Sequence, residues 1–185
     1  MKKVTKQTLS TCVNFGLLIS VAFILTSYIY FQKGFDILVN PQVANINYML
    51  CISGIFIGLR KLRSEVMPLI TYWQAFLAGS TMIAVAAIPF AIFMYFILSS
   101  NPDMIENAIQ LFEKGFKDAS YTEDQTKTFI DIYKAFATPA FLAFSQFINK
   151  AFMGLVFSLF LASFLSTKKN LPKTNNSTNF ENKEQ

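Results

Sequence analysis

The stretch YWQAFLAGSTMIAVAAIPFAIFMYFIL, residues 72–98, contains no charged side chain. It lies within the longest uncharged tract of the chain, residues 66–102, and a helix needs roughly 20 apolar residues to cross a bilayer. Tyr72 and Trp73 form an aromatic pair of the kind that favours the membrane–water interface. Pro89 is tolerated inside a spanning helix because neighbouring helices can satisfy the carbonyl that it frees. The stretch therefore predicts one bent transmembrane helix.

Three further apolar segments predict three further spans, at about residues 9–31, 44–59 and 142–166, and Lys150 is the one charged residue within them. Residues 151–166 alone would give only about 24 Å of helix, so the last span is expected to include residues before Lys150. The composition, with 53% hydrophobic and 15% charged residues, also places the chain among membrane proteins. We expect an all-α fold, with one four-helix transmembrane domain over residues 9–166.

An amphipathic helical hairpin, about residues 102–136, is expected between the third and fourth spans. Asn101 and Pro102 are typical of a helix start, and residues 122–125 form a capping box that opens a second helix. Apolar side chains recur at helical spacing on one face of each helix: Ile105, Ile109, Phe112 and Phe116, then Phe129, Tyr133 and Phe136. These faces could pack on each other, lie on the outer leaflet or bind a partner. Mutual packing or leaflet contact is the favoured interpretation.

The distribution of positive charge predicts how the chain is threaded. The N-terminus (residues 1–8), the loop after the second span and the tail (residues 167–185, expected to be disordered) should share one side. Nine cations lie there near the membrane, and Glu65 is the only nearby acid: Lys2, Lys3, Lys6, Arg60, Lys61, Arg63, Lys168, Lys169 and Lys173. The positive-inside rule assigns this side to the cytoplasm. Arg60, Lys61 and Arg63 are therefore interpreted as a topology anchor, with contact to lipid headgroups as the alternative.

Several function classes are disfavoured by the residues that the chain lacks. It has no histidine, which removes the commonest general base and the usual nitrogen ligand for zinc or haem. Cys12 and Cys51 lie in apolar segments and are expected to be buried. The cations sit at segment ends instead of on one soluble face, so nucleic acid is not expected as a partner. We expect no catalytic residue, no metal site and no cofactor.

Acids on the hairpin were considered as ligands for a divalent cation, and a solvated helix face is the favoured interpretation. These acids are Glu106, Glu113, Asp118, Glu123 and Asp124.

Lys150 is the one ionisable residue in the apolar stretch after Pro139. Charges inside a membrane are costly and often mark ion or substrate paths. Lys150 could instead extend its ammonium to the nearby interface, and this is the favoured interpretation, since no acid lies within the four spans to pair with it. It is a candidate interfacial or pathway charge.

Small residues mark a candidate packing face on the second span. Ser53 and Gly54 lie four to five residues before Gly58, a spacing that lets helices approach closely. We expect this helix to be the most buried of the four or to form a dimer contact.

The chain resembles an uncharacterised bacterial membrane family, the domain-of-unknown-function family numbered 4199, over roughly residues 9–169. The matching features are GLRKLRSE at residues 58–65, TYWQAFLAG at residues 71–79, the acidic helical pair after Asn101 and YKAFATP at residues 133–139. Trp73 and Leu77 depart from the small or basic residues expected there. The resemblance implies four transmembrane helices in a bacterial membrane and assigns no functional residue.

Two functions are consistent with these features. The first is a non-enzymatic membrane interaction or assembly component, whose partners are the lipid bilayer and a protein bound through the hairpin. The alternative is a small transporter or channel that works as a homo-oligomer.

Overall fold

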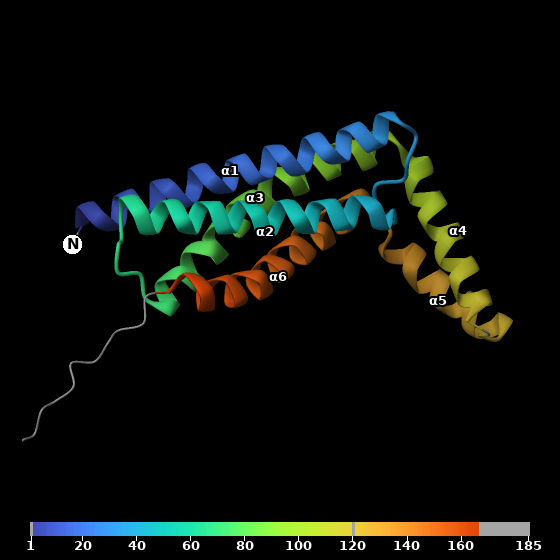
Figure 1. Ribbon diagram of the computed structural model, residues 1–185. Helices are drawn as coiled ribbons and strands as arrows, with labels where there is room; N and C mark the ends of the chain where they lie inside the picture. Colours follow the sequence, from blue (N-terminus) through green and yellow to red (C-terminus); the bar gives the residue numbers. More distant parts are fainter. Residues whose placement is uncertain (1, 120, 167–185) are drawn as a thin grey trace, which may run out of the picture.

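A computed structural model describes residues 2–119 and 121–166, and in these residues the chain is all-helical (Figure 1). The long helices are α1 (Lys2–Gln32), α2 (Pro41–Glu65), α3 (Tyr72–Ser100) and α6 (Pro139–Leu165), and two shorter helices are α4 (Pro102–Asp118) and α5 (Glu123–Phe136). The long helices are apolar enough to cross a membrane, so the chain is a multi-pass membrane protein. The predicted all-α class is confirmed. The tail predicted to be disordered lies outside the described residues.

Local signals in the sequence fix most helix starts. The Asn40 side chain accepts a hydrogen bond from the Gln42 backbone at the start of α2. Capping boxes open α3 at Thr71 and α5 at Thr122. The start of α2, before the expected residue 44, follows from the Asn40 cap and the proline after it.

Asn101 differs from its predicted role. It was expected to cap α4, but its side chain makes no hydrogen bond to that helix. Its Nδ2 donates instead to the carbonyl of Ile97, at 2.8 Å, and so satisfies an open carbonyl at the end of α3. Asn101 therefore occupies the N-cap position of α4, but the prediction that its side chain caps that helix was wrong, because the side chain is turned toward α3.

The central element of the bundle is α3, which contacts each of the other three spans and is the most buried of the four. The expectation that the second span is the most buried was therefore wrong. Small residues let the neighbours approach: a Cβ on Gly79 would lie 2.7 Å from Ser158 Oγ on α6, and one on Gly16 would lie 2.6 Å from the Met82 carbonyl oxygen.

The two ends of the bundle differ. The start of α1, the α2–α3 connection and the end of α6 lie together at one end, while α4 and α5 form a hairpin at the other (Figure 1). At the first end Arg63 Nη1 donates to the Leu165 carbonyl at 3.4 Å. The hairpin folds off to one side instead of continuing the bundle axis.

Candidate functional site

Lys150 lies at the meeting point of the four spans. Its Nζ is 5.5 Å from the ring centroid of Phe23 in α1, 5.7 Å from that of Tyr48 in α2 and 5.3 Å from that of Phe90 in α3. These distances are within the range of cation–π contacts. We call this group of four residues the Lys150 site. It draws one side chain from every span.

Lys150 was expected to extend its ammonium to the membrane surface, but the structure buries it inside the bundle. The residue is only 6% exposed. It belongs to a buried stripe of α6 that continues through Gly154 and Ser158. A Cβ on Gly154 would lie 2.6 Å from Ile83 Cβ, so this stripe is pressed against α3. This close packing turns Lys150 toward the interior of the bundle. In the sequence, the spacing of four residues between Lys150 and Gly154 indicates that both lie on one face of the helix.

Several polar side chains of the bundle core have no ion-pair or hydrogen-bond partner among the described residues. The ion pairs formed among the described residues, Lys61 with Glu65 and Lys117 with Glu113, do not involve Lys150. Four buried oxygens accept or donate no hydrogen bond: Ser20 Oγ, Ser27 Oγ, Asn47 Oδ1 and Ser158 Oγ. Buried polar groups without partners are costly and call for an explanation. The Lys150 site can hold a positive charge beside aromatic faces.

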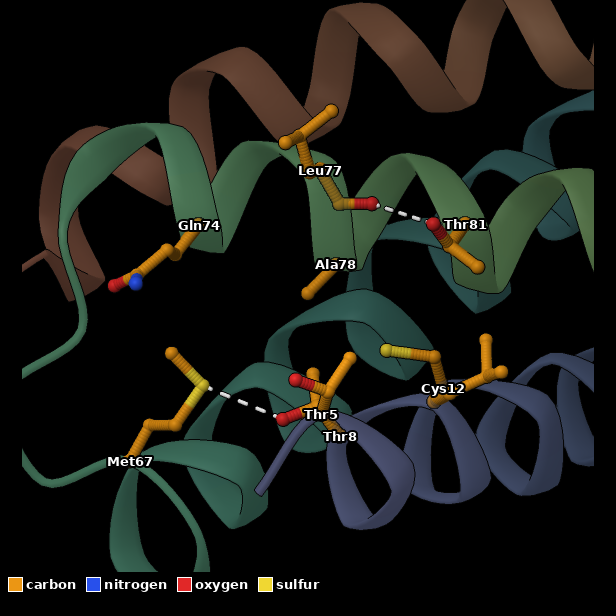
Figure 2. A pocket seen from close by; sticks show the side chains of 9 residues that line it. Thr5, Thr8, Cys12, Met67, Gln74, Leu77, Ala78 and Thr81 are labelled. Carbon is orange, nitrogen blue, oxygen red and sulfur yellow. Dashed lines mark hydrogen bonds between the residues drawn. The ribbon is translucent and has the colours of Figure 1, made fainter. Parts of the chain in front are cut away.

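An apolar hollow of about 260 Å³ lies at the end of the bundle away from the hairpin, between α1, α3 and the α2–α3 connection (Figure 2). Cys12, Leu77 and Ala78 contribute apolar walls, and Thr8 Oγ1 donates to Met67 Sδ at 3.4 Å across its rim. Leu77 is one of the residues by which this sequence departs from the expected family pattern. The hollow suits an apolar chain and offers no charged group to it.

The hairpin carries a charged groove on one side. A hollow of about 390 Å³ is lined by Glu113, Lys117, Glu123, Thr126, Lys127, Ile130, Asp131 and Lys134. A second hollow, of about 530 Å³, shares Glu113 and Lys134 with it and extends toward the start of α4. The Lys117 ammonium donates to Glu113 Oε1 at 2.8 Å, and this hydrogen bond lowers the pKa of Glu113 and raises that of Lys117. We call these two hollows the hairpin groove.

Between α4 and α5 the predicted aromatic faces pack on each other. The Phe112 and Tyr133 rings are 4.8 Å apart, and those of Phe116 and Phe129 stack at 5.3 Å. Burial raises the pKa of Tyr133. Phe136 departs from this pattern, since its ring lies 5.4 Å from that of Phe141 in α6. Of the alternatives left open by the sequence, mutual packing accounts for the middle of the hairpin.

The remaining candidates all lie on α2. Arg60, Lys61 and Arg63 are exposed at the end of α2. Gly54 and Gly58 contact α1, and Gly58 also contacts α3, whereas Ser53 points outward.

The cysteines and the acids do not gather into a group of metal ligands among the described residues. Cys12 and Cys51 are buried free thiols, as predicted. Within residues 2–119 and 121–166, no three His, Cys, Asp or Glu side chains lie together as metal ligands.

Comparison with known protein families places these features in one unit. The family model described as "protein of unknown function (DUF4199)" matches residues 14–167. The chain belongs to this family. The match runs from residue 14, more than three turns into α1, past the end of α6, so the DUF4199 region includes the Lys150 site, the hairpin groove and the basic end of α2. No curated protein and no solved structure matches the chain.

Proposed function

We propose that this membrane protein is a non-enzymatic interaction or assembly component that holds another protein through its external hairpin. The observation that carries the proposal is the hairpin groove, which presents acids and lysines side by side on an exposed surface. Charged groups arranged in this way select a partner by complementary charge and speed its approach. Surface charges of this kind add specificity more than affinity, so the partner should carry a matching pattern of both signs.

The proposed setting is the bacterial cytoplasmic membrane, with both termini in the cytoplasm and the hairpin outside. Support comes from the cations at the opposite end of the bundle, Arg60, Lys61 and Arg63, which are exposed at the end of α2. The partner would then be an extracytoplasmic protein or the external part of another membrane protein.

Crosslinking in intact cells tests the proposal. Photoreactive amino acids placed at Glu113 and Lys127, on opposite walls of the hairpin groove, should capture one specific second protein. Lys114 and Thr128 are matched controls, because each is the next residue on the same helix and neither lines the groove. Capture should be strong from the first pair and weak from the second.

A charge exchange gives the sharper test. Glu113→Lys should abolish capture from Lys127, and Glu113→Lys combined with Lys134→Glu should restore part of it if the pattern of charge is what the partner reads. Recovery of only the protein itself or lipid from the groove positions would contradict the proposal.

A second candidate is a small transporter or channel that works as a homo-oligomer. The Lys150 site favours it, because an unpaired charge inside a membrane bundle is often kept for an ion or substrate path. The test is thiol labelling of single cysteines along α2 and α6 in a Cys12→Ala, Cys51→Ala background, with a membrane-impermeant reagent. Reaction at Asn47→Cys would reveal a water path to the site. Uniform protection along both helices would rule transport out.

A further inference from the structure

The two sides of the α4–α5 hairpin differ in the large side chains that they expose. One side carries the hairpin groove with its charges. The other side exposes large apolar residues: Leu111 is 50% exposed, Ile132 is 53% exposed and Phe136 is 55% exposed. Lys114 and Asp118 follow Leu111 by three and seven residues, so this side combines exposed apolar side chains with charged ones, as a helix at the level of lipid headgroups does.

The apolar side faces the end of the bundle. Leu111 follows Met104 by seven residues, so both lie on the same face of α4. Met104 is buried and lines a hollow with Phe35 and Asp36, in the connection between α1 and α2. That connection lies at the hairpin end of the bundle (Figure 1). The face of α4 that lies against the bundle at Met104 therefore extends beyond the edge of the bundle at Leu111.

The apolar side is also continuous with the lipid-facing surface of α6. Phe136 contacts Phe141, which is 47% exposed near the start of α6 and is followed one turn later by the exposed Phe144. Only two residues separate the end of α5 at Phe136 from the start of α6 at Pro139, so no linker lifts the hairpin away from the membrane.

We propose that the apolar side of the hairpin rests on the leaflet at this end of the bundle, with Leu111, Ile132 and Phe136 inserted at the boundary between headgroups and acyl chains. We choose a lipid surface as the occupant because the apolar side is continuous with Phe141 and Phe144, which are exposed on a helix that is long and apolar enough to cross the membrane. The charged groove then faces away from the membrane. This inference does not depend on the groove having a protein partner.

Tryptophan fluorescence in vesicles tests the arrangement on the full chain. Trp73 is the only tryptophan, so Trp73→Phe provides a silent background. Two matched pairs are introduced singly: Leu111→Trp against Gln110→Trp in α4, and Ile132→Trp against Lys127→Trp in α5. Gln110 and Lys127 line the groove, on the side away from the proposed lipid contact.

Each variant is reconstituted into vesicles of phosphatidylcholine and phosphatidylglycerol, with and without bromine on the acyl chains. Bromolipid should quench Leu111→Trp and Ile132→Trp roughly threefold more than their partners, as expected for side chains at the acyl boundary. Aqueous iodide should show the reverse order. All substitutions are at exposed positions, and unchanged helical circular dichroism confirms folding.

Two results would overturn the inference. Equal quenching by iodide at Ile132→Trp and Lys127→Trp, with no bromolipid effect, would mean that the hairpin stands free in water. Protection of Ile132→Trp from both quenchers, strengthening as protein is concentrated in the vesicle, would mean that a second copy covers the face. Because the vesicles contain no partner protein, either failure leaves the crosslinking test of the groove unaffected.

Discussion

Replacing Lys150 with methionine should make the protein more stable. The ammonium lies 5.3–5.7 Å from three ring centroids, near the outer limit for a cation–π contact. A desolvated cation–π contact can reach about 2 kcal/mol at close range, and for these long distances we take about 0.5–1 kcal/mol for each ring, or roughly 1.5–3 kcal/mol together. A lysine at the centre of a membrane helix costs about 2.5–3.5 kcal/mol. The two amounts nearly cancel, which leaves the charge a small net cost.

Methionine changes this balance because it keeps the length of the side chain and removes the charge. Its sulfur should gain about 0.3–1.5 kcal/mol from each nearby ring. Lys150→Met is thus expected to raise the free energy of unfolding by about 1–3 kcal/mol. If the charge serves the transporter candidate, the same variant should also abolish transport.

The measurement is a titration with denaturing detergent, starting from mild micelles, followed by far-ultraviolet circular dichroism. Lys134→Met is the control, since it removes a lysine from the exposed hairpin groove and should leave the transition of the bundle unchanged. If Lys150→Met loses 1 kcal/mol or more (about fivefold in the unfolding constant) while the control does not, the reasoning fails. The ammonium would then be held by partners stronger than the three rings.

Three further predictions each concern one contact elsewhere in the protein. Gly154→Ala puts a Cβ 2.6 Å from that of Ile83 and should lower the free energy of unfolding by about 1–3 kcal/mol in the same titration; an unchanged midpoint would contradict close packing of α3 on α6. Thr122→Ala removes the N-cap of α5 and should cost roughly 1 kcal/mol locally, seen as faster amide hydrogen exchange in the first turn of α5 but not in α3. The hydrogen bond between Glu113 and Lys117 lowers the first pKa below its ordinary 4.5 and raises the second above its ordinary 10.5. Its stabilisation of α4 is fully present between those values and is lost as pH falls through the lowered pKa or rises through the raised one. Lys117→Met should remove this pH dependence of exchange in α4, and identical profiles in the two proteins would show that the pair does not form.

Short-range signals in the sequence were enough to predict the elements. Long apolar tracts predicted the four spans because a bilayer permits little other structure of that length. Thr122 and Gln125 predicted the start of α5 because a capping box needs only residues one turn apart. The prediction for Asn101 was wrong because a helix lies on each side of it, and the local pattern does not show which helix its side chain bonds to.

The orientation of helices about their own axes was the part that the sequence could not supply. Lys150 was expected at the membrane surface, from its distance to the start of α6. The structure places it among Phe23, Tyr48 and Phe90 because Gly154, on the same face, packs on α3. Long-range packing of this kind also made α3 the centre of the bundle. Its inward face is rich in alanine, which allows three neighbours to approach closely.

One residue joins α3 to α4 and two residues join α5 to α6, so the hairpin should move together with α3 and α6. Asn101 alone separates α3 from α4, so the hairpin base is fixed to the two helices that pack through Gly154 and Gly79. At 1.5 Å per residue, α4 is about 25 Å long, and a change of about 5° in its direction moves its far end by about 2 Å. A small sliding of α6 on α3 inside the membrane would therefore be amplified at the tip outside it, and a load on the tip would be transmitted to the helix that carries Lys150.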